Sequence, residues 1–91
     1  MAASGQKTVT TAGTAVQLGT QPCRCWVYLK AVPANTGVIY VGNDGAGDVT
    51  SSNGYPLSAS EQVVCYLDDL SQIWVDASTN SQTVAWFLDT P

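Results

Sequence analysis

The sequence predicts a single all-β domain, either a jelly-roll-like β-sandwich or a small barrel of about seven short antiparallel strands. Short runs of β-branched, aromatic and other apolar residues recur roughly every ten residues, with Gly, Pro, Asn and Ser between them. No apolar spacing of three and four residues lasts long enough to favour a helix. A chain of 91 residues supports one domain, and it buries about 60–65% of its unfolded surface on folding.

The N-terminal part predicts three strands. Residues 7–11 and 14–18 are short β-branched runs around a turn or bulge at Ala12-Gly13, and 25–32 is the clearest early strand. One face of that third strand is wholly apolar and should point into the core, whereas the other is amphipathic. The core-facing residues are Cys25, Val27, Leu29 and Ala31. Residues 1–6 are small and polar, so we expect a flexible arm before a domain spanning 7–91.

The middle of the chain predicts a hairpin followed by a long loop. The turn residues 33–37 separate 25–32 from the strand 38–42, and we expect these two strands to pair. Residues 43–60 are rich in Gly, Ser and Asp and form a long loop, with a short extended piece at 55–57. Loops of this length are often functional, so this one is a leading candidate for partner contact.

Three further strands complete the expected fold. They cover 61–67, 72–77 and 82–88, with Asp68-Asp69 in a solvated turn between the first two. Several strands must lie at sheet edges, and sparse charge protects those edges weakly. Pairing with another subunit is therefore expected.

Neutral polar residues replace charge throughout this sequence. It has 28 Ser, Thr, Asn and Gln residues against three Lys/Arg, seven Asp/Glu and no His, and its net charge is −4. Such a chain is poorly supplied with groups that move protons, hold metals or grip phosphate. We therefore expect a structural or binding protein without catalytic residues, cofactor or metal, which contacts neither nucleic acid nor membrane. No apolar run has the roughly 18 residues of a membrane span, and no signal peptide is expected.

The three cysteines are expected to be free thiols. An odd number of cysteines without a signal peptide favours a reducing compartment, and Cys23 and Cys25 would share one face of a strand. A Cys25–Cys65 bridge between neighbouring strands and a metal site are the alternatives, although two Cys in C-x-C plus one more make an incomplete zinc set.

Three constellations could carry chemistry. Facing carboxylates would suit glycoside hydrolysis, but a domain this small rarely encloses a sugar-sized cleft around Asp68-Asp69. Residues 42–48 are rich in oxygen-bearing side chains and Gly, as calcium-binding loops are, but their spacing matches no known calcium motif. A turn would have the same composition. The aromatic residues would suit sugar rings if exposed, but strand positions favour burial, so Tyr55 is the one expected at the surface.

Several segments resemble small virion proteins of tailed bacteriophages. They are PANTGVIYVG at 33–42, NGYPL at 53–57, LDDLSQIWVDA at 67–77 and the opening TVT and GTAVQL between 8 and 18. The Cys23-Arg24-Cys25 segment departs from that pattern. The resemblance implies an all-β particle protein that is not an enzyme: a capsid decoration (cement) protein or, alternatively, a tail, adaptor or fibre-associated protein.

The resemblance also implies a place and partners. A decoration protein is made in the host cytoplasm, sits on the outer capsid surface of the virion, often as a homotrimer, and bridges copies of the major capsid protein. A glycan-binding module is the remaining alternative. The candidate partner contacts are Asp44, Asp48, Asn53, Tyr55, Pro56 and Trp74.

Overall fold

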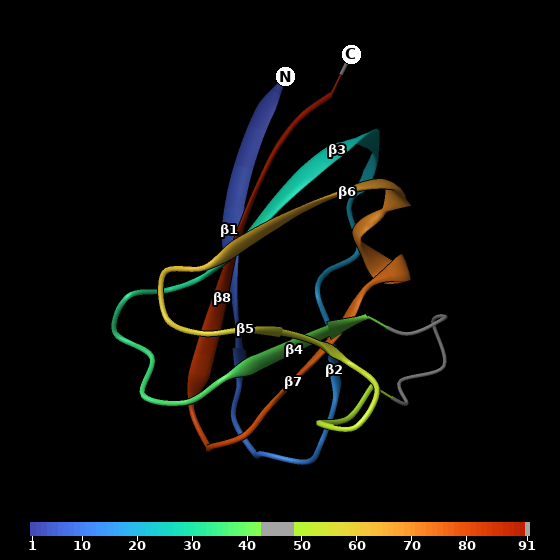
Figure 1. The fold of residues 1–91 in the computed structure, drawn as a ribbon. Helices are drawn as coiled ribbons and strands as arrows, with labels where there is room; N and C mark the ends of the chain where they lie inside the picture. The colour runs from blue at the N-terminus through green and yellow to red at the C-terminus, as the bar shows by residue number, and fades with distance from the viewer. Residues whose placement is uncertain (43–48, 91) are drawn as a thin grey trace.

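The computed structural model describes residues 1–42 and 49–90. Eight strands and one short 3₁₀ helix occupy these residues (Figure 1). The strands are β1 (Ala2–Val9), β2 (Val16–Gln17), β3 (Pro22–Ala31), β4 (Ile39–Gly42), β5 (Tyr55–Leu57), β6 (Gln62–Asp69), β7 (Trp74–Ala77) and β8 (Gln82–Asp89), and the helix is η1 (Leu70–Gln72).

The strands form two antiparallel sheets of four. The first sheet has the order β1-β8-β3-β6 and the second has the order β2-β7-β4-β5. This interleaving of strands from both ends of the chain is the order of an eight-stranded jelly roll. The predicted sandwich class is thereby confirmed. The alternative of a barrel is wrong, because the strands form two separate sheets. The extended piece expected at 55–57 is a strand, β5, so the described residues contain one strand more than the seven expected.

The core lies between the inner faces of the two sheets. In β3 every second residue is buried, so the apolar face predicted from the sequence does point inward. Val27, Leu29, Val84 and Leu88 supply the first sheet's half of this core. Ile39, Leu57, Val75 and their neighbours supply the other half from the second sheet.

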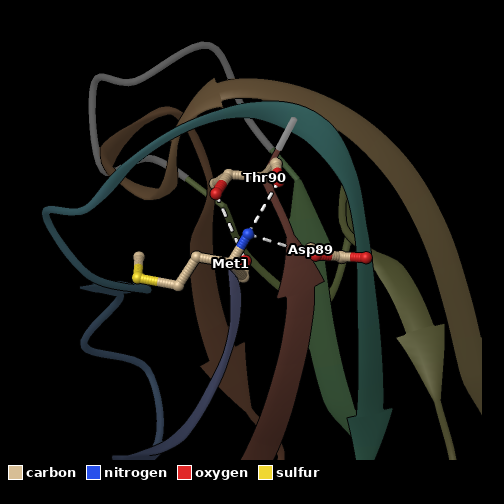
Figure 2. A network of polar contacts seen from close by, with 3 residues as sticks. All are labelled: Met1, Asp89 and Thr90. Carbon is tan, nitrogen blue, oxygen red and sulfur yellow. Dashed lines mark hydrogen bonds and ion pairs between the residues drawn. The ribbon is translucent and has the colours of Figure 1, made fainter.

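The first residues belong to a strand, so the expectation of a flexible arm at 1–6 is wrong. β1 pairs with β8 along its whole length, from Ala2 opposite Asp89 to Val9 opposite Gln82. Figure 2 shows how the two ends of the chain meet: the N-terminal ammonium donates to the Thr90 carbonyl at 2.9 Å and lies 3.4 Å from the Asp89 carboxylate. Both partners of this ion pair are largely exposed, so it adds at most about 1 kcal/mol. The backbone ladder holds β1 in place.

β3 and β4 do not form the predicted hairpin, because the turn between them carries the chain from the first sheet to the second. β3 is flanked by β6 and β8, whereas β4 is flanked by β5 and β7. Side chains fix this crossing. The buried Gln82 Oε1 accepts hydrogen bonds from the backbone N–H groups of Thr36 and Gly37, both at 2.8 Å. Asn35 exchanges two further bonds with the backbone of Thr83.

The described part of the expected long loop is ordered by its own hydrogen bonds. The Asn53 side chain accepts from the Thr50 N–H at 2.7 Å and closes a turn before β5. Glu61 accepts from the Ser58 N–H at 2.7 Å and closes the turn after it. The fold contains no helix of membrane-spanning length and apolarity between residues 1 and 42 or between 49 and 90.

Candidate binding face

The main exposed apolar surface lies on the outer side of the β1-β8-β3-β6 sheet. Five large apolar side chains there are between 40% and 60% exposed. We call this surface the aromatic face; its members are Trp26, Tyr28, Val64, Tyr66 and Phe87. At about 150–250 Å² for each fully exposed aromatic side chain, the face presents roughly 400–500 Å². That is within the range of the largest patches on soluble monomers, which are often functional.

The aromatic face results directly from strand alternation. The core residues of β3 take every second position, so Trp26 and Tyr28 must point to solvent. The sheet register then brings the others beside them: Tyr66 lies opposite Trp26, and Val64 and Phe87 lie opposite Tyr28 from either side. Residues from three strands therefore form one continuous surface.

One part of the aromatic face is held rigidly. A β-bulge interrupts the β3–β6 pairing between Pro22 and Cys25, and Arg24 within it has a φ of 47°. The bulge leaves the Arg24 carbonyl as an acceptor for the Tyr66 hydroxyl at 3.1 Å. The Tyr66 ring meets Trp26 edge to face, with centroids 5.7 Å apart and planes at 83°. Rings fixed in this way lose little entropy when a partner covers them.

A shallow hollow of about 390 Å³ adjoins the aromatic face. Its floor is Ala85, which lies between Gln6 on β1 and Lys30 on β3, and whose methyl group leaves room that a larger side chain would fill. Tyr28 and Phe87 line one side of the hollow, and Gln6, Lys30 and Gln62 supply amide and ammonium groups. Aromatic planes beside amide groups suit a ligand with both apolar faces and hydroxyls, such as a sugar ring.

The sequence does not reveal the aromatic face, because aromatic residues at strand positions are expected to be buried in the core or in a subunit interface. Tyr28, Tyr66 and Phe87 are each about half exposed, and Trp26 is 60% exposed. The usable signal is the run CWVYLKAV at 25–32, because its amphipathic second face carries Trp26 and Tyr28, and a strand with only one core leaves that face at the surface.

The contacts predicted from the sequence lie elsewhere. Tyr55 and Pro56 are exposed on β5, an edge of the second sheet, as expected for Tyr55. Trp74 is half-buried on β7 with β4 between it and β5, and its indole N–H has no partner among residues 1–42 and 49–90. Asn53 closes the turn described above. Asp44 and Asp48 lie outside the described residues. None of the four described contacts belongs to the aromatic face.

Within the described part of the chain, Asp68 and Asp69 do not form a facing pair with Asp76. Asp69 caps η1 by accepting from the Ser71 N–H at 2.9 Å, while Gln72 Oε1 reaches back to the backbone N–H groups of Asp68 and Asp69. The predicted solvated turn is thus the end of β6 and a helix cap. Asp76 lies in the other sheet and is 3% exposed.

Asp76 serves a structural purpose. One of its carboxylate oxygens accepts from the Gly13 N–H at 2.9 Å and the Ala77 N–H at 2.7 Å. This ties the turn after β1 to β7. Asn80, in the turn that follows β7, accepts from the Ala12 N–H and holds the same segment. A second hollow of about 460 Å³ opens beside it, between Gly13, Tyr40 and Ser78.

All three cysteines are free thiols, so the Cys25–Cys65 alternative is not formed. Cys23 and Cys25 are buried on the same face of β3, as predicted, and the Cys23 thiol donates to the Leu67 carbonyl at 3.1 Å. Burial, with the neighbouring Cys25 second, raises the pKa of Cys23. Burial alone raises the pKa of Cys65, which is partly exposed on β6.

Among residues 1–42 and 49–90, no three His, Cys, Asp or Glu side chains gather closely enough to hold a metal ion. The chain matches no family model, no curated protein and no solved structure.

Proposed function

We propose that this chain is a structural protein of a tailed-bacteriophage virion without enzymatic activity, and that it decorates the outer capsid surface by docking its aromatic face on the major capsid protein. The main observation that supports this proposal is the rigid aromatic face on the outer side of the β1-β8-β3-β6 sheet. The site chemistry supports binding: the patch offers apolar area and phenol groups, and the chain has no His to act as a general base at neutral pH. The particle itself is proposed from the resemblance of residues 33–42, 53–57 and 67–77 to small virion proteins.

The size of the patch supports docking on a protein. Each partner in a standard protein interface contributes about 800 Å², with an apolar centre and a polar rim. The aromatic face supplies roughly half of that area as a centre. The surrounding strands supply a mostly neutral polar rim, including Ser4, Gln6 and Gln62, with the charged Lys30 beside them. Hydrogen bonds from such a rim form without the desolvation cost of buried charges.

The test measures binding to capsids assembled without this protein. Trp26→Ser removes a ring that is 60% exposed on the aromatic face, and Tyr55→Ser removes one that is 59% exposed on the second sheet. We expect Trp26→Ser to weaken co-sedimentation with capsids at least tenfold, as for an interface hot spot. Tyr55→Ser should bind like the unchanged protein. Equal effects of both variants would rule out docking through the aromatic face.

The same preparation tests the position in the particle and the character of the contact. A copy number in purified virions that matches the capsid subunits supports decoration, whereas the low number of a tail ring or fibre supports the tail alternative. Docking through a neutral rim should weaken little between low and high salt. A steep loss of binding with salt would point to ion pairs instead.

A glycan-binding function is the second candidate, and the hollow above Ala85 favours it specifically. Sugar rings stack on exposed aromatic planes, and Tyr28 and Phe87 lie beside amide groups there. A glycan array at millimolar sugar tests this candidate, with Tyr28→Ala as the disabling variant and Tyr55→Ala as the control. Absence of binding by the unchanged protein would remove the candidate.

A further inference from the structure

The four sheet edges of this fold are not equally protected against pairing with another chain. Natural β proteins protect edges by keeping them short, by placing Pro in them, or by pointing a charged side chain inward from them. In the second sheet β2 has two residues, and β5 has three, of which one is Pro56. In the first sheet β1 carries Lys7 on its inner face, opposite the buried Val84. In β6 the only such feature is Asp69, a charged residue at an inner-face position at the very end of the strand, and residues 62–68 have none.

β6 is a long, regular and unprotected edge. It runs for eight residues, from Gln62 to Asp69, without Lys, Arg or Pro, and the bulge of this sheet lies in its neighbour β3. No described strand pairs with its other side (Figure 1). Its acidic residues, Asp68 and Asp69, stand at the end of the strand. The middle of the edge is therefore open to a partner strand.

The hydrogen-bond pattern shows which backbone groups of β6 face outward. The Ala31 N–H donates to the Glu61 carbonyl at 3.0 Å, which marks this pair as hydrogen-bonded across β3 and β6. Bonded pairs recur at every second residue of an antiparallel ladder, so Val63, Cys65 and Leu67 bond to β3. The four residues between them turn their N–H and C=O groups away from the sheet: Gln62, Val64, Tyr66 and Asp68.

We propose that β6 pairs with β6 of a second copy of this chain, in an antiparallel register centred on Cys65. In this register Gln62 bonds to the partner's Asp68 and Val64 to the partner's Tyr66, and the two-fold axis repeats both pairs. These pairs use every outward group of β6 except the Asp68 N–H, which donates to Gln72 Oε1 at 2.7 Å within each copy. The two Val64–Tyr66 pairs form two hydrogen bonds each, and the two Gln62–Asp68 pairs form one each, from the Gln62 N–H to the Asp68 carbonyl. A register centred on Val64 leaves the Asp68 carbonyl unpaired. A register centred on Tyr66 leaves Gln62 unpaired and places a carboxylate opposite Val64.

The chemistry of the cross-strand pairs supports the same register. Val64 opposite a Tyr is an aromatic–β-branched pair, and Gln62 opposite an Asp joins an amide donor to a carboxylate acceptor. The eight strands of two copies form one continuous sheet, and the two aromatic faces merge through Val64 and Tyr66. This association has two-fold symmetry, in contrast to the trimer implied by the resemblance, and it does not depend on what the aromatic face binds.

Charge sets how the association responds to salt. At the ends of the paired strands Glu61 lies opposite the partner's Asp69, and each copy carries a net charge of −4. Hydrogen bonds to Ser58 and Ser71 orient these two carboxylates within each copy. Since salt screens repulsion between like charges, the dimer should tighten as ionic strength rises.

The primary test is the mass of the protein in solution. Sedimentation equilibrium should give a dimer of twice 9.5 kDa. Its dissociation constant should decrease when the NaCl concentration is raised from about 0.05 to about 0.5 M. Val64→Pro removes an outward N–H and no bond to β3, so the protein should still fold but dimerise at least tenfold more weakly. Val64→Lys places a protecting charge at the same position and serves as a second variant. A monomer at millimolar concentration, or a trimer, would overturn the proposal.

A matched control lies on the opposite edge of the same sheet. The Thr90 N–H donates to the Met1 carbonyl, so the even-numbered residues of β1 face outward in the same way. Ser4→Pro therefore blocks the β1 edge by the same change and should leave the dimer intact. Loss of the dimer in Ser4→Pro but not in Val64→Pro would assign the interface to β1 and refute the β6 pairing.

Cys65 reports on the register. At a non-hydrogen-bonded antiparallel pair the Cα atoms are about 4.5 Å apart, which a disulfide can span. Diamide should therefore join two Cys65 thiols: one S–S bond forms, and the two electrons and two protons reduce the diamide N=N bond to a hydrazine. We expect cross-linked dimer from the unchanged protein, none from Cys65→Ser and at least tenfold slower cross-linking in Val64→Pro. Equal rates in the unchanged protein and Val64→Pro would refute the register.

Discussion

Removal of the Asp76 carboxylate should destabilise the fold far more than removal of an exposed aspartate. Asp76 is 3% exposed, and one oxygen accepts from two backbone N–H groups, those of Gly13 and Ala77. In Asp76→Ala both donors lose their acceptor. A buried donor without a partner costs about 1–3 kcal/mol, and Gly13 can recover part of that from water, so we expect a loss of about 2–4 kcal/mol.

Two further variants separate the hydrogen bonds from the charge. Asp76→Asn keeps the accepting oxygen and should cost about 1 kcal/mol. Asp89→Ala removes a carboxylate whose ion pair with the N-terminus is exposed, and it should cost less than about 1 kcal/mol. Urea unfolding followed by tryptophan fluorescence gives these values. With a slope of about 1–3 kcal/mol per molar, the midpoint of Asp76→Ala should fall by about 0.7–4 M.

The comparison between the two aspartates decides the argument. If Asp76→Ala loses no more stability than Asp89→Ala, the carboxylate does not anchor the turn to β7. If Asp76→Asn loses as much as Asp76→Ala, the charge matters and the hydrogen-bond geometry does not.

Substitutions at three other positions test other parts of the structure. Gln82→Ala frees the Thr36 and Gly37 N–H groups and should cost about 2–4 kcal/mol, with Gln82→Glu less costly because it keeps the acceptor; equal losses would contradict the acceptor role. Gly5→Ala places a methyl group 2.6 Å from a Trp86 ring carbon and should cost about 1–3 kcal/mol in thermal or urea unfolding, whereas an unchanged midpoint would show that Trp86 moves freely. The pKa of the Cys65 thiol is raised in the folded state, so the unfolded state loses this proton at a lower pH than the folded state does. The free energy of unfolding should therefore be unaffected by this thiol below the ordinary pKa of 9.0 and should decrease as the pH rises above it. Cys65→Ser should make that alkaline fall shallower, and identical slopes would exclude a contribution from this thiol.

The inward face of each main strand could be predicted from the sequence, but its neighbours could not. The alternation of side chains in 25–32 identified the core side of β3, because successive residues of a strand point to opposite faces and the face toward the core must be apolar. The same pattern does not say which strand lies alongside. The turn at 33–37 has hairpin composition, yet Gln82, far away in sequence, binds its backbone and directs the chain to the other sheet.

The N-terminal strand and the aromatic face were missed for related reasons. Residues 2–6 are small and polar, so their strand conformation comes from pairing with β8 and from Trp86 packing over Gly5, neither of which leaves a local pattern. The aromatic residues were assigned to the core because their chemistry favours burial. A sandwich of two sheets has one core, and the alternation places it on the other side of the same strands.

The interleaved strand order has a consequence for how the chain is made. β8 is synthesised after the other seven described strands, yet it lies between β1 and β3 in the finished sheet. Until it leaves the ribosome, the first sheet is missing a central member, and β1 has no described strand to pair with. The first sheet therefore cannot form completely until residues 82–89 are made, and it depends on contacts distant in sequence, which makes its folding slow for a domain of this size. A chain cut short before residue 82 would expose the edges of β1 and β3 that normally pair with β8. Such fragments should aggregate or be degraded.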